Sequence, residues 1–221
     1  MTTPRAASWM DRLAHDLRGP LSPMQTAVYL LRDELVVGSE RAELLAVMER
    51  QLRRLGGMID EVSDLGRAEK GRLVARREPL DLELLIADIT ARLHARPPEI
   101  TFAPDVQTVE LNGDVLRLGQ LFRVLLGLQL TRGVPAAVQA HIAWAAPGRL
   151  RMVCVVPCHD ATDALAHALL AMPQTDPPDE GLGLGVMIAC AIAEAHGGHL
   201  EAQAGNHAVE LVLELPARPS A

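Results

Sequence analysis

Apolar residues recur with heptad spacing along the first third of the chain. Between residues 6 and 37 two seams repeat every seven positions: Met10, Leu17, Met24 and Leu31, then Leu21, Val28 and Leu35. Residues 40–68 carry two more: Leu44, Met58 and Leu65, then Met48, Leu55 and Val62. Two seams on one helix are typical of a helix in a bundle or coiled coil.

Gly38 and Ser39 interrupt this pattern, and Ser39 is a suitable N-cap for the second helix. Two long helices joined by so short a turn form an antiparallel hairpin. A hairpin cannot bury all of its seams by itself. We therefore expect a homodimer in which two hairpins make a four-helix bundle.

The character of the chain changes after the second helix. We place a dimerisation hairpin at 1–70, a polar linker at 71–80 and a second domain at 81–221. The expected helices of this domain are 81–95, 114–131, 160–171 and 184–196. The expected strands are 99–103, 107–111, 136–145, 149–156, 198–204 and 207–215. The predicted fold class is α+β, a helical hairpin followed by an α/β sandwich with a mixed sheet and helices on one face.

Charge and composition limit the classes of partner. The net charge of −7 falls on residues 97–221, which carry 6 basic and 13 acidic side chains. An acidic C-terminal half argues against nucleic-acid binding. No run of 18 apolar residues and no signal peptide is evident, so we expect no membrane association and a cytoplasmic protein.

The three cysteines, Cys154, Cys158 and Cys190, form no paired pattern, which favours a reducing compartment. Cys154, Cys158 and His159 are spaced so that a metal site can be considered. No second ligand pair accompanies them, and packing at a strand end explains them better. We predict no metal site.

A candidate phosphoacceptor lies in the first helix. Residues 14–24 read Ala-His-Asp-Leu-Arg-Gly-Pro-Leu-Ser-Pro-Met, and His15 lies off both seams. A neutral imidazole nitrogen can attack a phosphoryl group, and the carboxylate of Asp16 can set the tautomer and take up the proton. The alternative is that His15 is an ordinary surface histidine on a bundle helix. Arg18 either contacts the phosphoryl group or a partner's acidic pocket, or is simply a solvated arginine.

The two halves together resemble the sensor histidine kinases of two-component signalling. The segment His15-Asp16-Leu17-Arg18-Gly19-Pro20-Leu21 is similar to their H-box. Two later groups are similar to the start of their N-box and to their second glycine box with its helix: Asp114, Arg117, Leu118 and Gln120, then Gly181-Leu182-Gly183-Leu184-Gly185, Ile188 and Glu194-Ala195-His196-Gly197-Gly198. The resemblance covers nearly the whole chain after residue 8.

The chain departs from that family where the family binds Mg-ATP. The N-box asparagine that holds Mg²⁺ corresponds to Leu128, the earlier asparagine to Val124 and the usual lysine to Thr131. Leucine offers no oxygen to a hard cation. The first glycine box corresponds to residues 156–162, which contain no glycine, and Asp160 is at best a displaced adenine-reading aspartate.

The resemblance with these departures implies a dimeric histidine phosphotransferase, a pseudokinase that relays phosphoryl groups through His15 to or from response-regulator receiver domains. Asp16 and Arg18 would assist, and each receiver would supply its own Mg²⁺. Gly181, Gly183 and Gly185 would be a remnant of the glycine box with no cofactor to bind. Gly19 stands where the family carries a residue that assists dephosphorylation, so we expect little phosphatase activity. The alternatives are an active kinase with a divergent ATP site and a non-catalytic dimeric adaptor that binds a response regulator.

Overall fold

The computed structural model describes residues 4–31, 39–93, 97–106, 109–130, 137–175, 177 and 181–219, with side chains from Leu17 onward except those of Arg18 and Ser39. The chain divides into two compact units. The N-terminal unit comprises residues 1–63 with 179–182, and the C-terminal unit comprises residues 64–178 with 183–221. No helix in the described ranges is both long and apolar enough to cross a membrane.

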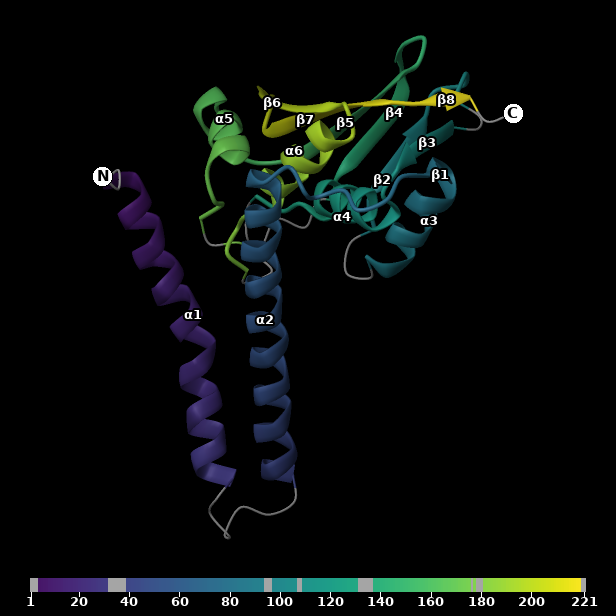
Figure 1. Cartoon of the computed structure of the whole chain (residues 1–221). Helices are drawn as coiled ribbons and strands as arrows, with labels where there is room; N and C mark the ends of the chain where they lie inside the picture. The colour runs from purple at the N-terminus through teal and green to yellow at the C-terminus, as the bar shows by residue number, and fades with distance from the viewer. Residues whose placement is uncertain are drawn as a thin grey trace. The chain divides into compact units, whose positions relative to one another are not determined.

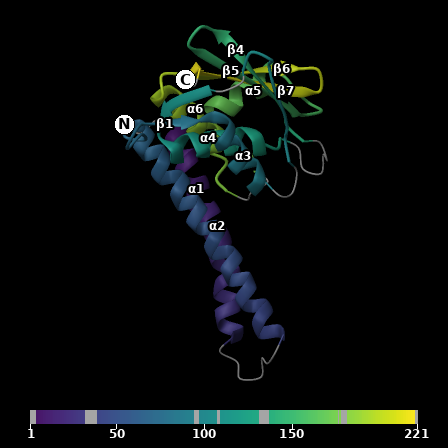
Figure 2. The same ribbon diagram turned by 90° about the vertical axis from the view of Figure 1, so that its right-hand side faces the viewer.

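The N-terminal unit is built on two long antiparallel helices, α1 (Pro4–Leu31) and α2 (Ser39–Glu69), shown in Figures 1 and 2. Both expected helices are confirmed. The helix α1 continues through Pro20 and Pro23. The residues between the two helices, with Leu35 and Gly38 among them, lie outside the described ranges.

The apolar surface of α2 is wider than the two predicted seams. Met58 is fully buried, and the other seam residues are half-buried. A third heptad row, which the sequence reading missed, remains open: Leu45, Leu52 and Ile59 are 48%, 53% and 56% exposed. We call these three residues the open row.

The helix α1 also has one apolar seam that is partly covered and one that is exposed. Its first seam is half-buried at Leu17, Met24 and Leu31. Leu21 and Val28 of its second seam are exposed. One seam of α1 is therefore covered within the unit, and the other still presents apolar surface to solvent.

The C-terminal unit contains two sheets. Five strands form a mixed sheet in the order β2 (Glu99–Phe102), β4 (Gln139–Ala146), β5 (Arg149–Pro157), β7 (Ala208–Pro216) and β6 (His199–Gly205). The pair β2–β4 is parallel, and the others are antiparallel. A three-stranded antiparallel sheet, β1 (Glu78–Asp81), β3 (Val109–Gly113) and β8 (Arg218–Pro219), lies beside it.

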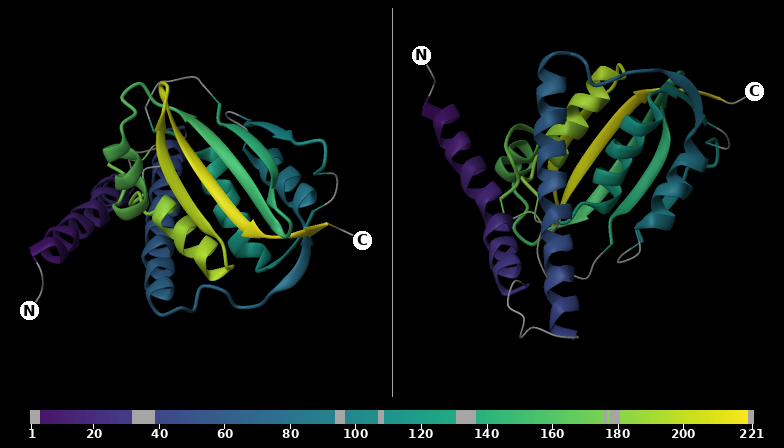
Figure 3. Two further views of the ribbon diagram at one scale, coloured as in Figure 1. Left: turned by 90° about the horizontal axis from the view of Figure 1, so that it is seen from above. Right: turned by 60° about the horizontal axis from the view of Figure 1, so that its bottom comes forward.

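Figure 3 shows the helices α3 (Leu82–Arg92), α4 (Val115–Gly127) and α6 (Gly185–Ala195) against one face of the five-stranded sheet, with α5 (Asp163–Ala171) near β6. The layered arrangement and the mixed sheet are as predicted. The expectation of a single sheet was wrong, because β1 and β8 pair with β3 across long stretches of chain. The predicted helix 114–131 ends at Gly127, and the helix 160–171 begins only at Asp163.

The core lies between this sheet and its helices. Strands β5 and β7 alternate buried and less buried residues, as expected of strands covered on one face. Phe122 on α4 is the largest fully buried side chain there. It lines an interior space with Leu82, Ile142, Leu150, Met152, Leu213 and Leu215.

Replacing Phe122 by alanine should remove a large part of this packing. We expect the free energy of unfolding to fall by about 3–5 kcal/mol, the usual cost of a buried aromatic deletion. Leu116 lies on the same helix but is 82% exposed, so Leu116→Ala should change it by less than about 0.5 kcal/mol. Urea denaturation of both variants checks this, and equal effects would contradict the placement of the core.

Candidate functional site

The predicted phosphoacceptor lies within α1, sixteen residues before the end of that helix at Leu31. The backbone of His15, Asp16 and Arg18 is helical, while their side chains lie outside the described part of the structure. Because Pro20 and Pro23 have no N–H, they cannot donate to the carbonyls four residues earlier, at Asp16 and Gly19. The main chain beside His15 therefore carries carbonyls without the usual helical donor.

The N-terminus of α4 is organised by one carboxylate. Asp114 is the N-cap, and its Oδ1 accepts the N–H groups of Leu116 and Arg117 at 3.1 and 3.3 Å. Its Oδ2 accepts the N–H groups of Ala75 and Arg76 at 3.0 and 3.5 Å. Burial pushes the pKa of Asp114 upward, but these four N–H groups outweigh it and hold the pKa below its ordinary value. The carboxylate thus joins the segment after α2 to the start of α4.

The imidazole of His196 is fixed from both sides. Its Nε2 accepts the N–H of Asp114 at 3.0 Å, and its Nδ1 lies 2.7 Å from the carbonyl oxygen of Ile192. These partners require a neutral ring with the proton on Nδ1. Burial lowers the pKa of His196, and the nearby Arg77 lowers it further, although Ile192 and Asp114 act in the opposite sense. The ring leaves no room for a Cβ at Gly113, which would lie 2.7 Å from His196 Cδ2.

The next turn of α4 holds the end of α2. Arg117 Nη1 lies 2.8 Å from Asp64 Oδ1, and Gln120 Nε2 donates to Asp64 Oδ2 at 2.8 Å. Arg117 also donates to Gln120 Oε1 and to the carbonyl of Leu73. Asp64 is buried, so its charge needs these partners. The residues that resemble the start of an N-box therefore have structural duties in this chain.

The C-terminal half of α4 is apolar where the resemblance expects nucleotide ligands. Val124 faces α6, and a Cβ on Gly185 would lie 3.6 Å from its Cγ1. Leu128 is buried and follows the last helical residue. Thr131 lies outside the described ranges. Valine and leucine offer neither oxygen ligands for Mg²⁺ nor donors for phosphate.

The connection from β5 to α5 is compact without glycine. Cys158 is buried, and its N–H donates to the carbonyl of His207 at 2.9 Å. His159 and Asp160 are exposed. The Oγ1 of Thr162 accepts the N–H of Leu165 and caps α5. The helix α5 therefore begins directly after the segment where the family resemblance places a glycine loop.

The second glycine segment is used for packing. Gly183 has φ +74°, and a Cβ there would lie 2.3 Å from the carbonyl oxygen of Gln174. The N–H of Gln174 donates to Gly183 O at 2.8 Å, and its side-chain amide donates to the carbonyl of Gln129 at 2.8 Å. Gly185 begins α6. In the N-terminal unit, Gly181 is followed by Leu182, whose N–H donates to Glu61 Oε1 at 3.4 Å.

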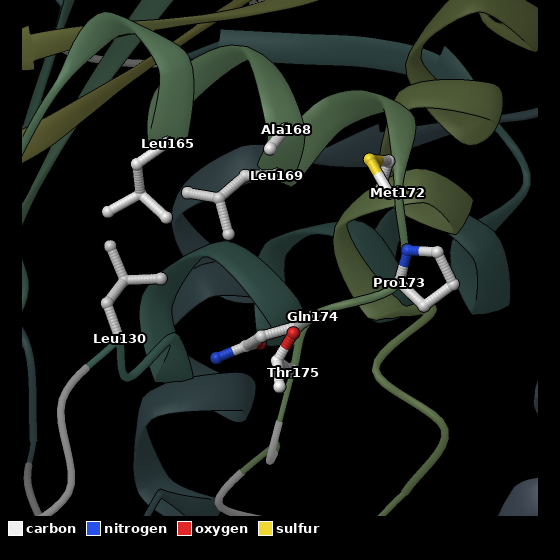
Figure 4. A pocket seen from close by; sticks show the side chains of 8 residues that line it. All are labelled: Leu130, Leu165, Ala168, Leu169, Met172, Pro173, Gln174 and Thr175. Carbon is white, nitrogen blue, oxygen red and sulfur yellow. The ribbon is translucent and has the colours of Figure 1, made fainter. Parts of the chain in front are cut away.

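A cavity of about 190 Å³ lies between α5 and the segment that follows α4 (Figure 4). Its lining has no charged side chain: Leu130, Leu165, Ala168, Leu169, Met172, Pro173, Gln174 and Thr175. Sites for drug-sized ligands usually measure about 300–1,000 Å³. This cavity is smaller, and it offers no cation for a triphosphate.

The residues in the described ranges therefore do not fit a magnesium nucleotide. They also hold no cluster of three or more His, Cys, Asp or Glu side chains suited to a metal ion. The roles of Asp64 and Gln174 were not predicted from the sequence, because their contacts are made with residues more than forty positions away.

The lowered pKa of His196 has a consequence for stability. In the unfolded chain this ring has a pKa near 6.5, and in the folded chain its pKa is lower. As the pH falls, the unfolded state therefore binds the proton first, which favours unfolding. The free energy of unfolding should be at its full value above pH 6.5 and decline below it. We expect His196→Gln to flatten this decline between about pH 7 and 5.5 relative to the native chain. An unchanged slope in urea titrations across that range would contradict the assignment.

Residues 7–71 match the His Kinase A (phospho-acceptor) domain. The chain is 28% identical to the sensor protein ChvG of Rhizobium meliloti over 94% of its length, and 26% identical to the kinase/phosphatase MprB of Mycolicibacterium paratuberculosis over 90%. It spans 40% of the length of each of these relatives.

Two solved structures have the same fold. The histidine kinase AdeS of Acinetobacter baumannii superposes with a TM-score of 0.68 at 16% identity, covering 91% of this chain and 97% of that one. The histidine kinase ThkA, solved in complex with the response regulator TrrA, gives 0.67 at 17% identity, covering 94% and 60%. The chain thus contains a His Kinase A phosphoacceptor domain followed by a domain with the histidine-kinase ATPase fold, and it resembles the two-component sensor histidine kinases.

Proposed function

We propose that this chain is a dimeric histidine phosphotransferase that relays a phosphoryl group between receiver domains through His15, without using Mg-ATP. One observation carries the proposal, the division of α4. Its first half keeps Asp114, Arg117 and Gln120, which hold the fold together. Val124 in its second half and Leu128, just after its last residue, stand where the family resemblance expects nucleotide ligands.

In this proposal the N-terminal unit transfers a phosphoryl group from one receiver domain to another. A ring nitrogen of His15 attacks the phosphorus of an aspartyl phosphate on a receiver, and the bond from phosphorus to the carboxylate oxygen breaks. The reverse step passes the group to an aspartate on a second receiver. The carboxylate of Asp16 orients the ring and holds its other proton, and Arg18 faces the charge of the phosphoryl group. Such transfer depends mainly on positioning and electrostatics.

The receiver supplies the Mg²⁺ in this scheme, because its own acidic pocket binds the ion. The complex of ThkA with TrrA supports a receiver as partner, since that kinase has the same fold. An active kinase remains the alternative, and it is favoured by relatives that are described as kinases, such as MprB. The two readings differ in whether label reaches His15 from ATP.

The dimer is supported by the open row of α2 together with Leu21 and Val28 of α1. Contiguous exposed apolar surface on a soluble protein marks an interaction site. Heptad spacing on both helices fits a second copy of the same hairpin, since four helices bury two seams each.

Replacing His15 should abolish the relay. We expect His15→Ala to take up no label from a panel of receiver domains prephosphorylated with radiolabel, because no other ring occupies its place in α1. His167→Ala, at an exposed histidine of the C-terminal unit, serves as the matched control and should behave like the native chain. Label that persisted in His15→Ala would contradict the proposal, and an unlabelled native chain with tightly bound receiver would favour an adaptor.

Placing a charge in the open row should dissociate the dimer. We expect Leu52→Glu to shift the mass measured by light scattering from two chains to one, because a carboxylate would be buried without a partner. Arg53→Glu adds a charge one residue away at a solvent-exposed position and should leave the dimer intact. A dimer that survived Leu52→Glu would assign another surface to self-association.

A further inference from the structure

Two histidine rings meet at one end of the C-terminal unit. His159 follows β5, and His207 lies in the tight turn between β6 and β7. Their ring centroids are 6.4 Å apart with the planes inclined at 69°. The backbone beneath them is joined by the hydrogen bond from Cys158 N to His207 O, at 2.9 Å. The two rings are therefore carried on connected main chain.

The backbone at His207 is in an unfavourable conformation. Its φ is +53°, and among the described residues it is the only one other than glycine with a positive φ. Glycine or asparagine adopts this conformation at lower cost. An asparagine, Asn206, is present in the same turn, but it is His207 that has the positive φ. Strain of this kind is found where a side chain has a task that a less strained residue would not perform.

The rings lie near the spacing that a shared metal ion requires. A metal bound to a ring nitrogen at about 2.0–2.1 Å lies roughly 3.2 Å from the ring centroid, so two rings on one tetrahedral ion have centroids about 5.2 Å apart. The observed centroids are 6.4 Å apart, so the rings must approach each other by roughly 1 Å to share an ion. Both side chains are exposed, so small rotations can bring the nitrogens to the ion.

The surroundings are acidic, which favours a cation. Asp160 follows His159, and Asp163 accepts the N–H of Ala204 at 3.3 Å on the adjoining hairpin. The side chain of Glu210, on β7, lies beside Gly205 at the end of β6. No arginine or lysine lies among residues 157–163 or 203–210.

We propose that His159 and His207 together bind a divalent late transition-metal ion, of which Zn²⁺ is the probe we would use. No third protein ligand converges among the described residues, so water completes the coordination and the ion exchanges readily. Imidazole nitrogen is a preferred ligand of this class of metal. The bound ion ties the β5–α5 connection to the β6–β7 turn. This site is independent of the phosphotransfer proposed above.

Calorimetric titration of the full, untagged chain with Zn²⁺ tests the site. We expect one ion per chain, and a raised thermal midpoint because the ion binds the folded state. Loss of an outer-shell partner alone usually weakens a metal site by about 10–100-fold, so His159→Ala and His207→Ala should each weaken binding at least tenfold. His167→Ala and His199→Ala, at an exposed and a half-buried histidine elsewhere in the unit, should not.

The variant His207→Gly separates the site from the fold. Glycine relieves the positive φ, so without metal this variant should unfold at a temperature equal to or above that of the native chain, yet it should lose the rise caused by Zn²⁺. Zn²⁺ binding that was absent, or that persisted in His207→Gly, would overturn the proposal. Equal loss in His199→Ala would place the ion elsewhere and would overturn it too.

Discussion

The C-terminal unit depends on the hydrogen bonds that converge on the N-terminus of α4. The carboxylate of Asp114 accepts four backbone N–H groups, and the backbone N–H of the same residue donates to Nε2 of His196. These bonds connect the segment after α2, the start of α4 and the end of α6. A buried carboxylate without such donors would cost several kcal/mol.

The polar residues of the same helix that resemble a kinase N-box also hold the fold together. One turn beyond Asp114, Arg117 and Gln120 hold the carboxylate of Asp64. These polar residues are needed whether or not a ligand binds. Val124 and Leu128, in contrast, now contribute apolar packing near α6 and the end of the helix. Gly183 likewise makes close backbone contact with Gln174. The resemblance to sensor kinases therefore survives in the residues that support the fold.

The long periodic segments were predictable because heptad spacing reports helical faces directly. The sequence reading found α1 and α2, the alternation of the sheet domain and the unusual residues of α4. It missed the open row, since the reading stopped at two seams per helix. It missed β1 and β8 because pairs such as Glu78 with Gly113, or Glu110 with Arg218, join distant positions with no local signal. The ends of helices also shifted, as at Gly127, where Leu128 leaves the helical conformation.

The residues of the candidate site were likewise only partly predictable from the sequence. His15 could be found from the sequence because its chemistry is local, one imidazole beside one carboxylate within a recognisable segment. The structural roles of Asp114 and His196 could not be found from the sequence, because their hydrogen-bond partners come from three separate parts of the chain. A motif shows which residue types are present, whereas packing decides whether they serve a ligand or the fold.

The most direct test of the account is the source of the phosphoryl group. Purified chain would be incubated with γ-labelled Mg-ATP and, separately, with a panel of labelled phosphorylated receiver domains. The account predicts label on His15 from at least one receiver and none from ATP. Label arriving on His15 from ATP would show an active kinase and would contradict the interpretation of Val124 and Leu128.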